Sequence, residues 1–267
     1  MLLIFDSHPV QYKAPVYQRM EQLRPGSFEV IYASDCSVRG HRDKEFGEVV
    51  TWDMPLLSGY RNRILKNECG VPLSGFRSLT GRGIYRLLKK ERPDAVLLSQ
   101  FSYESDLAVF LSCVWLRIPL WIRHETQDEA FRRPLWKRVV RHIFYRAAYR
   151  CVKHAFYIGQ LNREHLLRHG LPENRISFAP YCVAPAFPSS TKEKQERRDA
   201  LRTQLGVTAN ETLLLFSGKL IEKKNPKLIL QALPLIPAAN ISRLKVVFVG
   251  SGELSETLQN MAAATPV

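Results

Sequence analysis

The sequence lacks paired cysteines and long hydrophobic runs. Its five cysteines are an odd number, and none forms a Cys-x-x-Cys pair, which argues against a disulfide framework or a zinc ribbon and favours the reduced thiols of a cytosolic protein. The longest apolar run, 107–116, ends at Arg117 and is too short to span a bilayer. Because the apolar start is interrupted at Asp6, we also expect no signal peptide.

Acidic residues are scarce as well. The 267 residues include 39 lysines and arginines but 25 aspartates and glutamates, which gives a formal net charge of +14. A surplus of this size indicates an anionic partner, such as nucleic acid, an anionic membrane or a phosphorylated ligand. Hydrophobic residues make up 45% of the chain, which is enough for the cores of one large or two ordinary domains.

Short apolar segments alternate with helical patterns along most of the chain. Strands are expected at residues 2–5, 28–33, 49–52, 95–99, 119–122, 155–158, 213–216 and 244–249. Helices are expected at 16–23, 82–91, 106–115, 162–169, 227–233 and 254–263, and loops at 36–48 and 54–80. This alternation predicts an α/β fold with a doubly wound parallel sheet.

The composition changes near residue 184. Residues 184–198 contain prolines, serines and charges in place of a periodic pattern, and such a shift is typical of a domain boundary. We therefore expect a first domain at 1–183 and a second at 184–267.

Polar residues follow two of the expected strands in the first domain. His8, Gln11 and Tyr12 come after the first strand, and His124 comes after the strand at 119–122. The carboxyl ends of parallel strands face the ligand crevice, so the imidazole of His124 is a candidate to accept a hydrogen bond from a substrate hydroxyl. Two alternatives stay open: His8 caps a helix, and His124 is a surface histidine paired with Glu125.

A second candidate site lies in the second domain. An apolar run at 213–216 leads into Gly218, and Lys219 and Lys224 follow before Pro226, which suits the first turn of a helix. A strand, a glycine turn and a helix with two nearby ammonium groups are typical of a phosphate site. The alternative is an ordinary turn with solvated lysines.

Another glycine pair follows the strand at 244–249. Gly250 and Gly252 allow close approach of the backbone to a ligand. They are therefore candidates for a loop on the nucleotide side of the same site.

The segment 131–150 is basic and amphipathic. Its apolar face holds Trp136, Val139, Val140, Ile143, Phe144 and Ala147, and the opposite face holds Lys137, Arg138, Arg141 and His142. No acidic residue occurs between Ala130 and Arg163. Such a helix suits an anionic bilayer surface, with Arg133, Lys137, Arg138 and Arg141 as candidate membrane-facing residues. A solvated basic face on a core helix is the alternative, and nucleic acid is not the expected partner, because the aromatic rings form no stacking platform.

Together these motifs resemble those of GT-B glycosyltransferases, and of family GT4 in particular. The resemblance rests on the loop His8-Pro-Val-Gln-Tyr-Lys-Ala-Pro15, on Arg123-His124-Glu125, on 162–180, on Ser217-Gly218-Lys219 with Lys224, and on Phe248-Val-Gly-Ser-Gly-Glu253. It implies two Rossmann-like domains, with the acceptor side at 1–183 and the start of the nucleotide-sugar side at 184–267.

The resemblance also implies a function. It implies transfer of a sugar from a nucleotide-diphosphate sugar to a glycan or lipid-linked acceptor, with retention at the anomeric carbon and without a metal or other cofactor. Gly218, Lys219 and Lys224 would hold the donor diphosphate, and His124 would act at the catalytic site. The expected setting is cell-envelope polysaccharide synthesis in the cytoplasm, peripheral to the inner face of the membrane.

Two features depart from the family pattern. The glutamate pair that holds the donor sugar and ribose in the family is missing, and Tyr181-Cys182 stand where an asparagine-glycine hinge is expected. We therefore expect a truncated second domain and a fragment that is inactive alone. An inactive membrane scaffold and a GT-B epimerase or phosphorylase remain alternatives.

Overall fold

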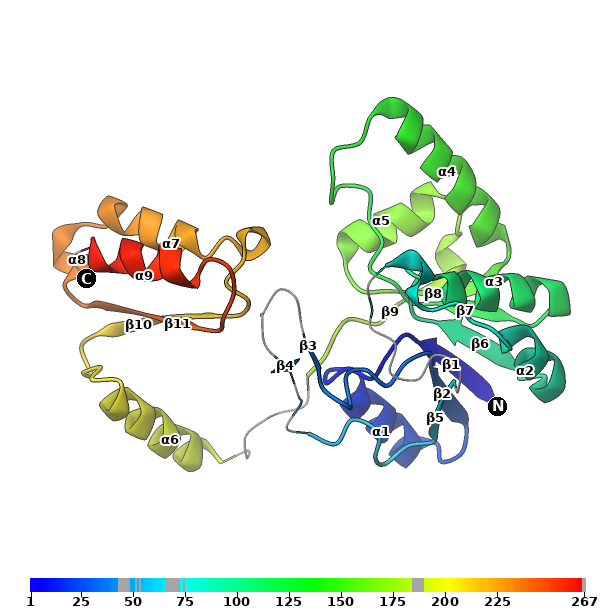
Figure 1. Cartoon of the computed structure of the whole chain (residues 1–267), viewed down its shortest axis with the longest axis horizontal. Coiled ribbons are helices and arrows are strands. Elements are labelled where there is room, and N and C mark those ends of the chain that lie inside the picture. The colour runs from blue at the N-terminus through cyan, green and yellow to red at the C-terminus, as the bar shows by residue number, and fades with distance from the viewer. Residues whose placement is uncertain are drawn as a thin grey trace. The chain divides into compact units, whose positions relative to one another are not determined.

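The chain, seen here in a computed structural model, divides into two units (Figure 1). Unit 1 comprises Met1–Gly40 and Thr51–Ala184, and unit 2 comprises His41–Val50 and Pro185–Val267. The structure describes residues 1–42, 49–50, 52, 54–65, 73, 75–183 and 190–265.

Unit 1 is built around a seven-stranded sheet in the order β5-β2-β1-β6-β7-β8-β9, and all of its pairings are parallel. The strands are β1 (Leu2–Asp6), β2 (Phe28–Tyr32), β5 (Asn62–Ile64), β6 (Ala95–Leu98), β7 (Leu120–Ile122), β8 (Val152–Tyr157) and β9 (Ile176–Phe178). The helices are α1 (Ala14–Leu23), α2 (Ile84–Glu91), α3 (Glu104–Leu116), α4 (Leu135–Arg150) and α5 (Gln160–Arg168). The predicted doubly wound parallel sheet is therefore confirmed.

Apolar clusters cover both faces of this sheet. Successive strand residues point to opposite faces, so Leu3 of β1 packs in one cluster, with Val109 of α3 and Leu166 of α5. Ile4 packs in the other cluster, with Tyr17 of α1. Burial on both faces explains why the central strands read as continuous apolar runs in the sequence.

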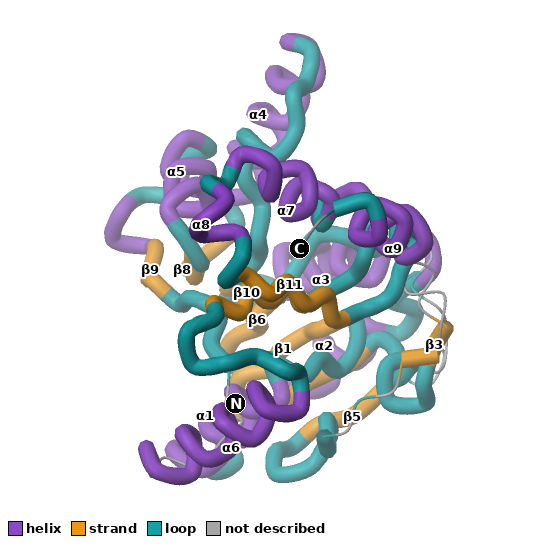
Figure 2. Tube along the Cα trace, turned by 90° about the vertical axis from the view of Figure 1, so that its left-hand side faces the viewer, coloured by secondary structure: helices purple, strands orange, loops and turns teal. Residues whose placement is uncertain are grey.

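The strand expected at 49–52 is not part of the seven-stranded sheet. β5 (Asn62–Ile64) lies at one edge of the sheet (Figure 2) and pairs with β2, whereas β4 (Val49–Val50) pairs antiparallel with β3 (His41–Arg42) in a separate two-stranded sheet. β5 carries no apolar pattern, because only Ile64 of its three residues packs against an apolar cluster, and Asn62 and Arg63 make polar contacts. The hydrophobic pattern of the sequence therefore did not predict a strand inside the expected loop 54–80.

Unit 2 contains one parallel strand pair, β10 (Thr212–Ser217) and β11 (Leu244–Val249). Its helices are α6 (Thr191–Gln204), α7 (Lys227–Ala232), α8 (Ala238–Ile241) and α9 (Ser255–Ala263). The core of the unit consists of leucines from the strand–helix connections and the helices: Leu220, Leu230, Leu233, Leu254 and Leu258.

Candidate functional site

His124 lies at the carboxyl end of β7, as expected, but it is buried. Its Nδ1 accepts the backbone N–H of Thr126 at 3.2 Å, and its Nε2 lies 3.2 Å from the hydroxyl of Tyr149. Glu125 instead accepts a hydrogen bond from the hydroxyl of Tyr181, so His124 is not a surface histidine paired with Glu125. Both ring nitrogens are engaged within unit 1, and neither is open to a substrate hydroxyl in this arrangement.

A directional chain of hydrogen bonds links the buried His124 to the half-buried Asp128. Since a backbone N–H only donates, Nδ1 of His124 is unprotonated, and the neutral ring carries its proton on Nε2. Nε2–H therefore donates to the Tyr149 hydroxyl, which donates to Nε2 of His165 at 2.9 Å. His165 then holds its own proton on Nδ1 and donates it to Asp128 at 3.0 Å.

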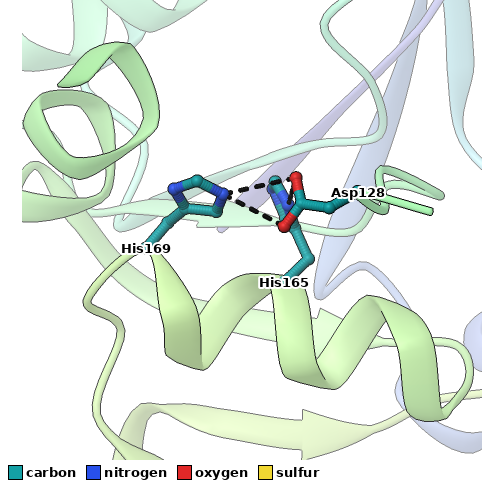
Figure 3. A group of neighbouring side chains, drawn as sticks. All are labelled: Asp128, His165 and His169. Atoms are coloured by element: carbon teal, nitrogen blue, oxygen red, sulfur yellow. Dashed lines mark hydrogen bonds and ion pairs between the residues drawn. The ribbon is translucent and has the colours of Figure 1, made fainter. Parts of the chain in front are cut away.

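Asp128, His165 and His169 form a compact cluster whose arrangement raises the question of a metal site (Figure 3). Each offers one ligand atom, and these atoms lie within 4.8 Å of one another. However, the hydrogen-bond direction leaves Nδ1 of His165 protonated, and Arg168 donates to Asp128 at 2.9 Å. A bound cation would require His165 to lose the proton on Nδ1 and would lie close to the guanidinium of Arg168. The three side chains therefore fit a hydrogen-bonded structural cluster better than a metal centre.

Burial lowers the pKa of both linked histidines. The pKa of His124 falls to about 3, because burial and then the charge of His165 oppose protonation. The pKa of His165 falls to about 4, because burial outweighs the attraction of Asp128. Both rings are therefore neutral near physiological pH, which agrees with the direction of the chain.

The loop after β1 lies beside the carboxyl end of β7. The ring of Tyr12 stands edge-on to Tyr181 at 5.1 Å, and the guanidinium of Arg123 lies 4.6 Å from the centre of the Tyr181 ring. These three residues line a mainly apolar pocket of about 290 Å³. His8 hydrogen-bonds the Ser7 hydroxyl at 2.9 Å, and Gln11 is half-buried.

Two buried carboxylates near this edge were missed by the sequence analysis. Asp6 accepts hydrogen bonds from Lys13 and Tyr17, both at 2.5 Å. Burial would raise the pKa of Asp6, but Lys13 and the hydrogen bonds lower it overall. Asp106 accepts the backbone N–H groups of Ser102 and Tyr103, yet burial raises its pKa to about 6. The sequence signal for Asp106 is an acid in the first turn of a helix.

Helix α4 is oriented opposite to the expectation for a core helix. The side packed in the core carries Tyr145, Ala148 and Tyr149, whereas the apolar stripe predicted from the helical wheel faces solvent, with Trp136 63% and Ile143 63% exposed. The apolar face of the helical wheel is therefore not the face that α4 buries. The alternative of a solvated basic face on a core helix agrees with the exposed Lys137 and Arg138 and with the buried Tyr149. Among the described residues, no helix is both long and apolar enough to cross a membrane.

The four predicted membrane-facing residues lie in different environments. Lys137 and Arg138 are exposed, and Arg133 is half-buried. Arg141 is also half-buried, with its guanidinium 3.9 Å from Asp128. The structure therefore turns Arg141 toward α5, on the same side of α4 as Tyr145.

In unit 2 the parallel register brings both glycine loops to one edge. Ser217 pairs with Val249 at the strand ends, and the backbone N–H of Gly218 donates to Val249 O at 2.9 Å. The N–H of Leu220 donates to Ser251 O at 2.9 Å. The two loops thus form one hydrogen-bonded surface at the carboxyl end of the strand pair.

Contact between these loops explains why Gly250 and Gly252 are glycines. A Cβ at Gly250 would lie 2.0 Å from Gly218 O, and one at Gly252 would lie 2.5 Å from Leu220 O. The close approach that the sequence analysis assigned to a ligand is made here to the neighbouring loop.

We expect Gly250→Ala to destabilise unit 2 by about 1–3 kcal/mol, because the two loops must separate to accept the methyl group. The free energy of unfolding in urea measures this effect. Gly75→Ala is the control, because a Cβ at Gly75 would meet no atom within 4 Å. Equal stability of the two variants would show that the loop contact is not required.

Both candidate lysines lie in the connection between β10 and α7. Lys219 is half-buried directly after Gly218, and Lys224 is exposed at the end of a 3₁₀ turn, Glu222–Lys224. Pro226 is the N-cap of α7, which has six residues. In so short a helix, positive charge at this corner comes mainly from the lysine side chains.

Comparison with known proteins agrees with this architecture. Residues 197–267 match the family of glycosyl transferases group 1. No curated protein gave a match in sequence.

Solved structures resemble the chain over nearly its full length. UDP-GlcNAc 2-epimerase from Methanocaldococcus jannaschii shares 19% identity at a TM-score of 0.56, covering 98% of this chain and 69% of its own. HepE of Anabaena, in complex with UDP-glucose, shares 15% at a TM-score of 0.57, with coverages of 99% and 65%. WaaG, a glycosyltransferase involved in lipopolysaccharide biosynthesis, shares 12% at 0.54, with coverages of 99% and 67%.

The parallel sheet of unit 1 and the strand pair of unit 2 thus define an α/β protein with the GT-B fold. Within it, residues 197–267 are the part that is similar to the group 1 glycosyl transferases.

Proposed function

We propose that the protein is a retaining glycosyltransferase that moves a sugar from a nucleotide-diphosphate sugar to a glycan or lipid-linked acceptor in cell-envelope polysaccharide synthesis. The observation that carries the proposal is the pair of hydrogen-bonded glycine loops, with Lys219 and Lys224, inside the segment that matches the group 1 family. HepE, solved with UDP-glucose, and WaaG, involved in lipopolysaccharide biosynthesis, share the fold.

The chemistry of the donor explains the choice of lysines. Cleavage of the bond between the sugar and the phosphate leaves additional negative charge on the diphosphate. Ammonium groups fixed beside the departing oxygens stabilise that charge more in the transition state than in the bound donor. The proposal assigns this role to Lys219 and Lys224, without a metal ion, and makes Gly250 and Gly252 part of the surface behind them.

In unit 1 the proposal places the acceptor near the carboxyl ends of β1 and β7. His8, Gln11 and Tyr12 would contribute on the acceptor side. Because both nitrogens of His124 are engaged, we assign its side chain to positioning the strand end rather than to accepting a proton. Arg123, next to it, reaches the pocket that Tyr12 lines.

We further propose that the protein works in the cytoplasm, peripheral to the inner face of the membrane. The net charge of +14 and the exposed apolar stripe of α4 support this placement. A lipid-linked acceptor would then be within reach.

An epimerase acting on a nucleotide sugar is the second candidate. It is favoured by the similarity in fold to UDP-GlcNAc 2-epimerase, which extends over 98% of this chain. An epimerase would use the same diphosphate corner and leave the sugar on the nucleotide.

One assay separates the two candidates. The longest polypeptide that contains this chain is incubated with UDP-GlcNAc, UDP-glucose or GDP-mannose and a membrane extract. A transferase releases nucleoside diphosphate and labels the extract with sugar, whereas an epimerase returns an isomerised nucleotide sugar. If neither product forms, and no nucleotide sugar raises the melting temperature, the proposed function is wrong.

A further inference from the structure

The outward side of α4 is an apolar surface, which we call the α4 stripe. It consists of Phe131 and the helix residues Leu135, Trp136, Val139, Val140, Ile143 and Phe144, each at least half exposed. The first turns of α4 project beyond the rest of unit 1 in both views (Figure 1, Figure 2). Exposed apolar surface in this amount is typical of an interaction site.

A basic pocket lies against the other side of the same turns, and we call it the arginine pocket. It has a volume of about 650 Å³. Its charged lining comprises the guanidiniums of Arg132, Arg133, Arg138, Arg141 and Arg168 and the carboxylates of Asp128 and Glu129. Five positive groups against two negative ones leave the pocket cationic.

The internal ion pairs leave part of this charge available. Arg168 and Arg141 are directed to Asp128, at 2.9 and 3.9 Å. In the described part of the chain, no carboxylate forms an ion pair with Arg132 or Arg138. These two side chains are exposed at the pocket, so an entering anion meets charges that are not already neutralised.

The pocket and the stripe share a rim. Phe131, Leu135 and Val139 line the arginine pocket and also belong to the α4 stripe. A ligand with a phosphate at one end and a hydrocarbon chain at the other can therefore occupy both surfaces at once. Soluble phosphates would leave the stripe exposed, and nucleic acid offers no match for its aliphatic residues.

We propose that the arginine pocket binds the phosphate headgroup of an anionic membrane lipid, while the α4 stripe enters the acyl region of the bilayer. This inference rests on the peripheral membrane location proposed above and adds a defined headgroup site to it. Arg132 and Arg138 contact the phosphate, and Trp136 and Ile143 anchor the helix.

Vesicle binding tests the headgroup site. The chain is mixed with vesicles of phosphatidylcholine, alone or with phosphatidylglycerol. We expect the double variant Arg132→Gln/Arg138→Gln to bind the anionic vesicles about tenfold more weakly. The double variant Lys89→Gln/Lys90→Gln, which removes the same charge from exposed positions on α2, should bind within about twofold of the unmodified chain.

A second pair of variants tests the stripe. Trp136→Ser should abolish most binding to anionic vesicles, whereas Trp115→Ser, which removes a 79% exposed tryptophan from α3, should not. Equal binding by the two tryptophan variants would refute the insertion of the α4 stripe into the bilayer. Sedimentation experiments that show self-association through the stripe would refute it as well.

Three results would overturn the headgroup site. They are equal weakening by the arginine and lysine pairs, competition by inorganic phosphate beyond that of chloride at the same ionic strength, and preferential binding to RNA. Nucleotide-sugar turnover with soluble substrates is measured separately. A protein with turnover but without the arginine effect refutes this inference alone, and the reverse result refutes the transferase alone.

Discussion

Replacement of Lys219 with alanine is expected to lower the rate of sugar transfer about 100- to 1,000-fold, which is the usual effect of removing one preorganised group that stabilises charge in a transition state. Lys219 directly follows Gly218, in the loop that is hydrogen-bonded to the end of β11. Its ammonium group would face the departing diphosphate in the proposed mechanism. Lys224→Ala should act in the same direction. The measurement is kcat/KM for nucleoside diphosphate release in the presence of acceptor.

The control for this prediction lies in the same turn. Lys223→Ala removes an equal charge from an exposed neighbour that has no assigned role, so it should change kcat/KM by no more than about threefold. Melting temperatures of all three variants show whether folding is affected. If Lys219→Ala folds normally and transfers sugar at the unmodified rate, the assignment of the diphosphate site is wrong.

Acidification is expected to destabilise unit 1. The pKa values of His124 and His165 are about 3 and about 4 in the folded chain, below the 6.5 of the free side chain. The unfolded state therefore binds more protons below about pH 6.5, and stability falls as the pH falls. At about 1.4 kcal/mol for each pKa unit, each imidazole costs about 2 kcal/mol between about pH 7 and pH 5.

Asp106 opposes this trend. Its pKa is raised to about 6 from 3.8, so the folded state takes up a proton first and gains about 1.4 kcal/mol as the pH falls to about 5. The expected net loss is about 3 kcal/mol, a large share of a typical stability of about 5–15 kcal/mol. Urea unfolding at the two pH values measures it.

A matched pair of variants assigns the effect. His124→Asn removes one of the titrating rings, so the acid-induced loss should fall from about 3 to about 1 kcal/mol. Val152→Ala removes buried apolar volume from β8 and should destabilise the chain while leaving the acid-induced loss unchanged. Equal stability of the unmodified chain at both pH values would refute the prediction, and so would a full loss in His124→Asn.

The sequence predicted the central strands well because they are buried on both faces. The expected ranges 2–5 and 95–99 each differ by one residue from the buried strands β1 and β6. β5 could not be found in this way, since Ile64 is the single apolar residue of Asn62–Ile64, a strand that pairs with β2 at the edge of the sheet. Edge pairing leaves no hydrophobic pattern in the sequence.

The sequence predicted which residues lie at the candidate site better than it predicted what their side chains contact. Residues that follow parallel strands meet at one edge, which is why Tyr12 and Arg123 line the same pocket. The sequence did not predict that His124 would be turned inward to Tyr149. That orientation depends on hydrogen bonds between residues far apart in the sequence: Tyr149 is 25 residues from His124 and 16 residues from His165. A local motif cannot predict such contacts.

By itself, the sequence determined the α/β architecture, the basic surplus and the glycine–lysine loop of the group 1 segment, because strand burial, charge and turn chemistry are local properties. Only the tertiary structure decided which side of α4 is buried. The helical wheel gives two faces and does not say which is buried. Tyr145 and Tyr149 pack in the apolar cluster of unit 1, so the apolar stripe faces solvent and arginines of α4 line the pocket. Which face a helix buries is set by the elements that surround it, and those are chosen by the whole chain.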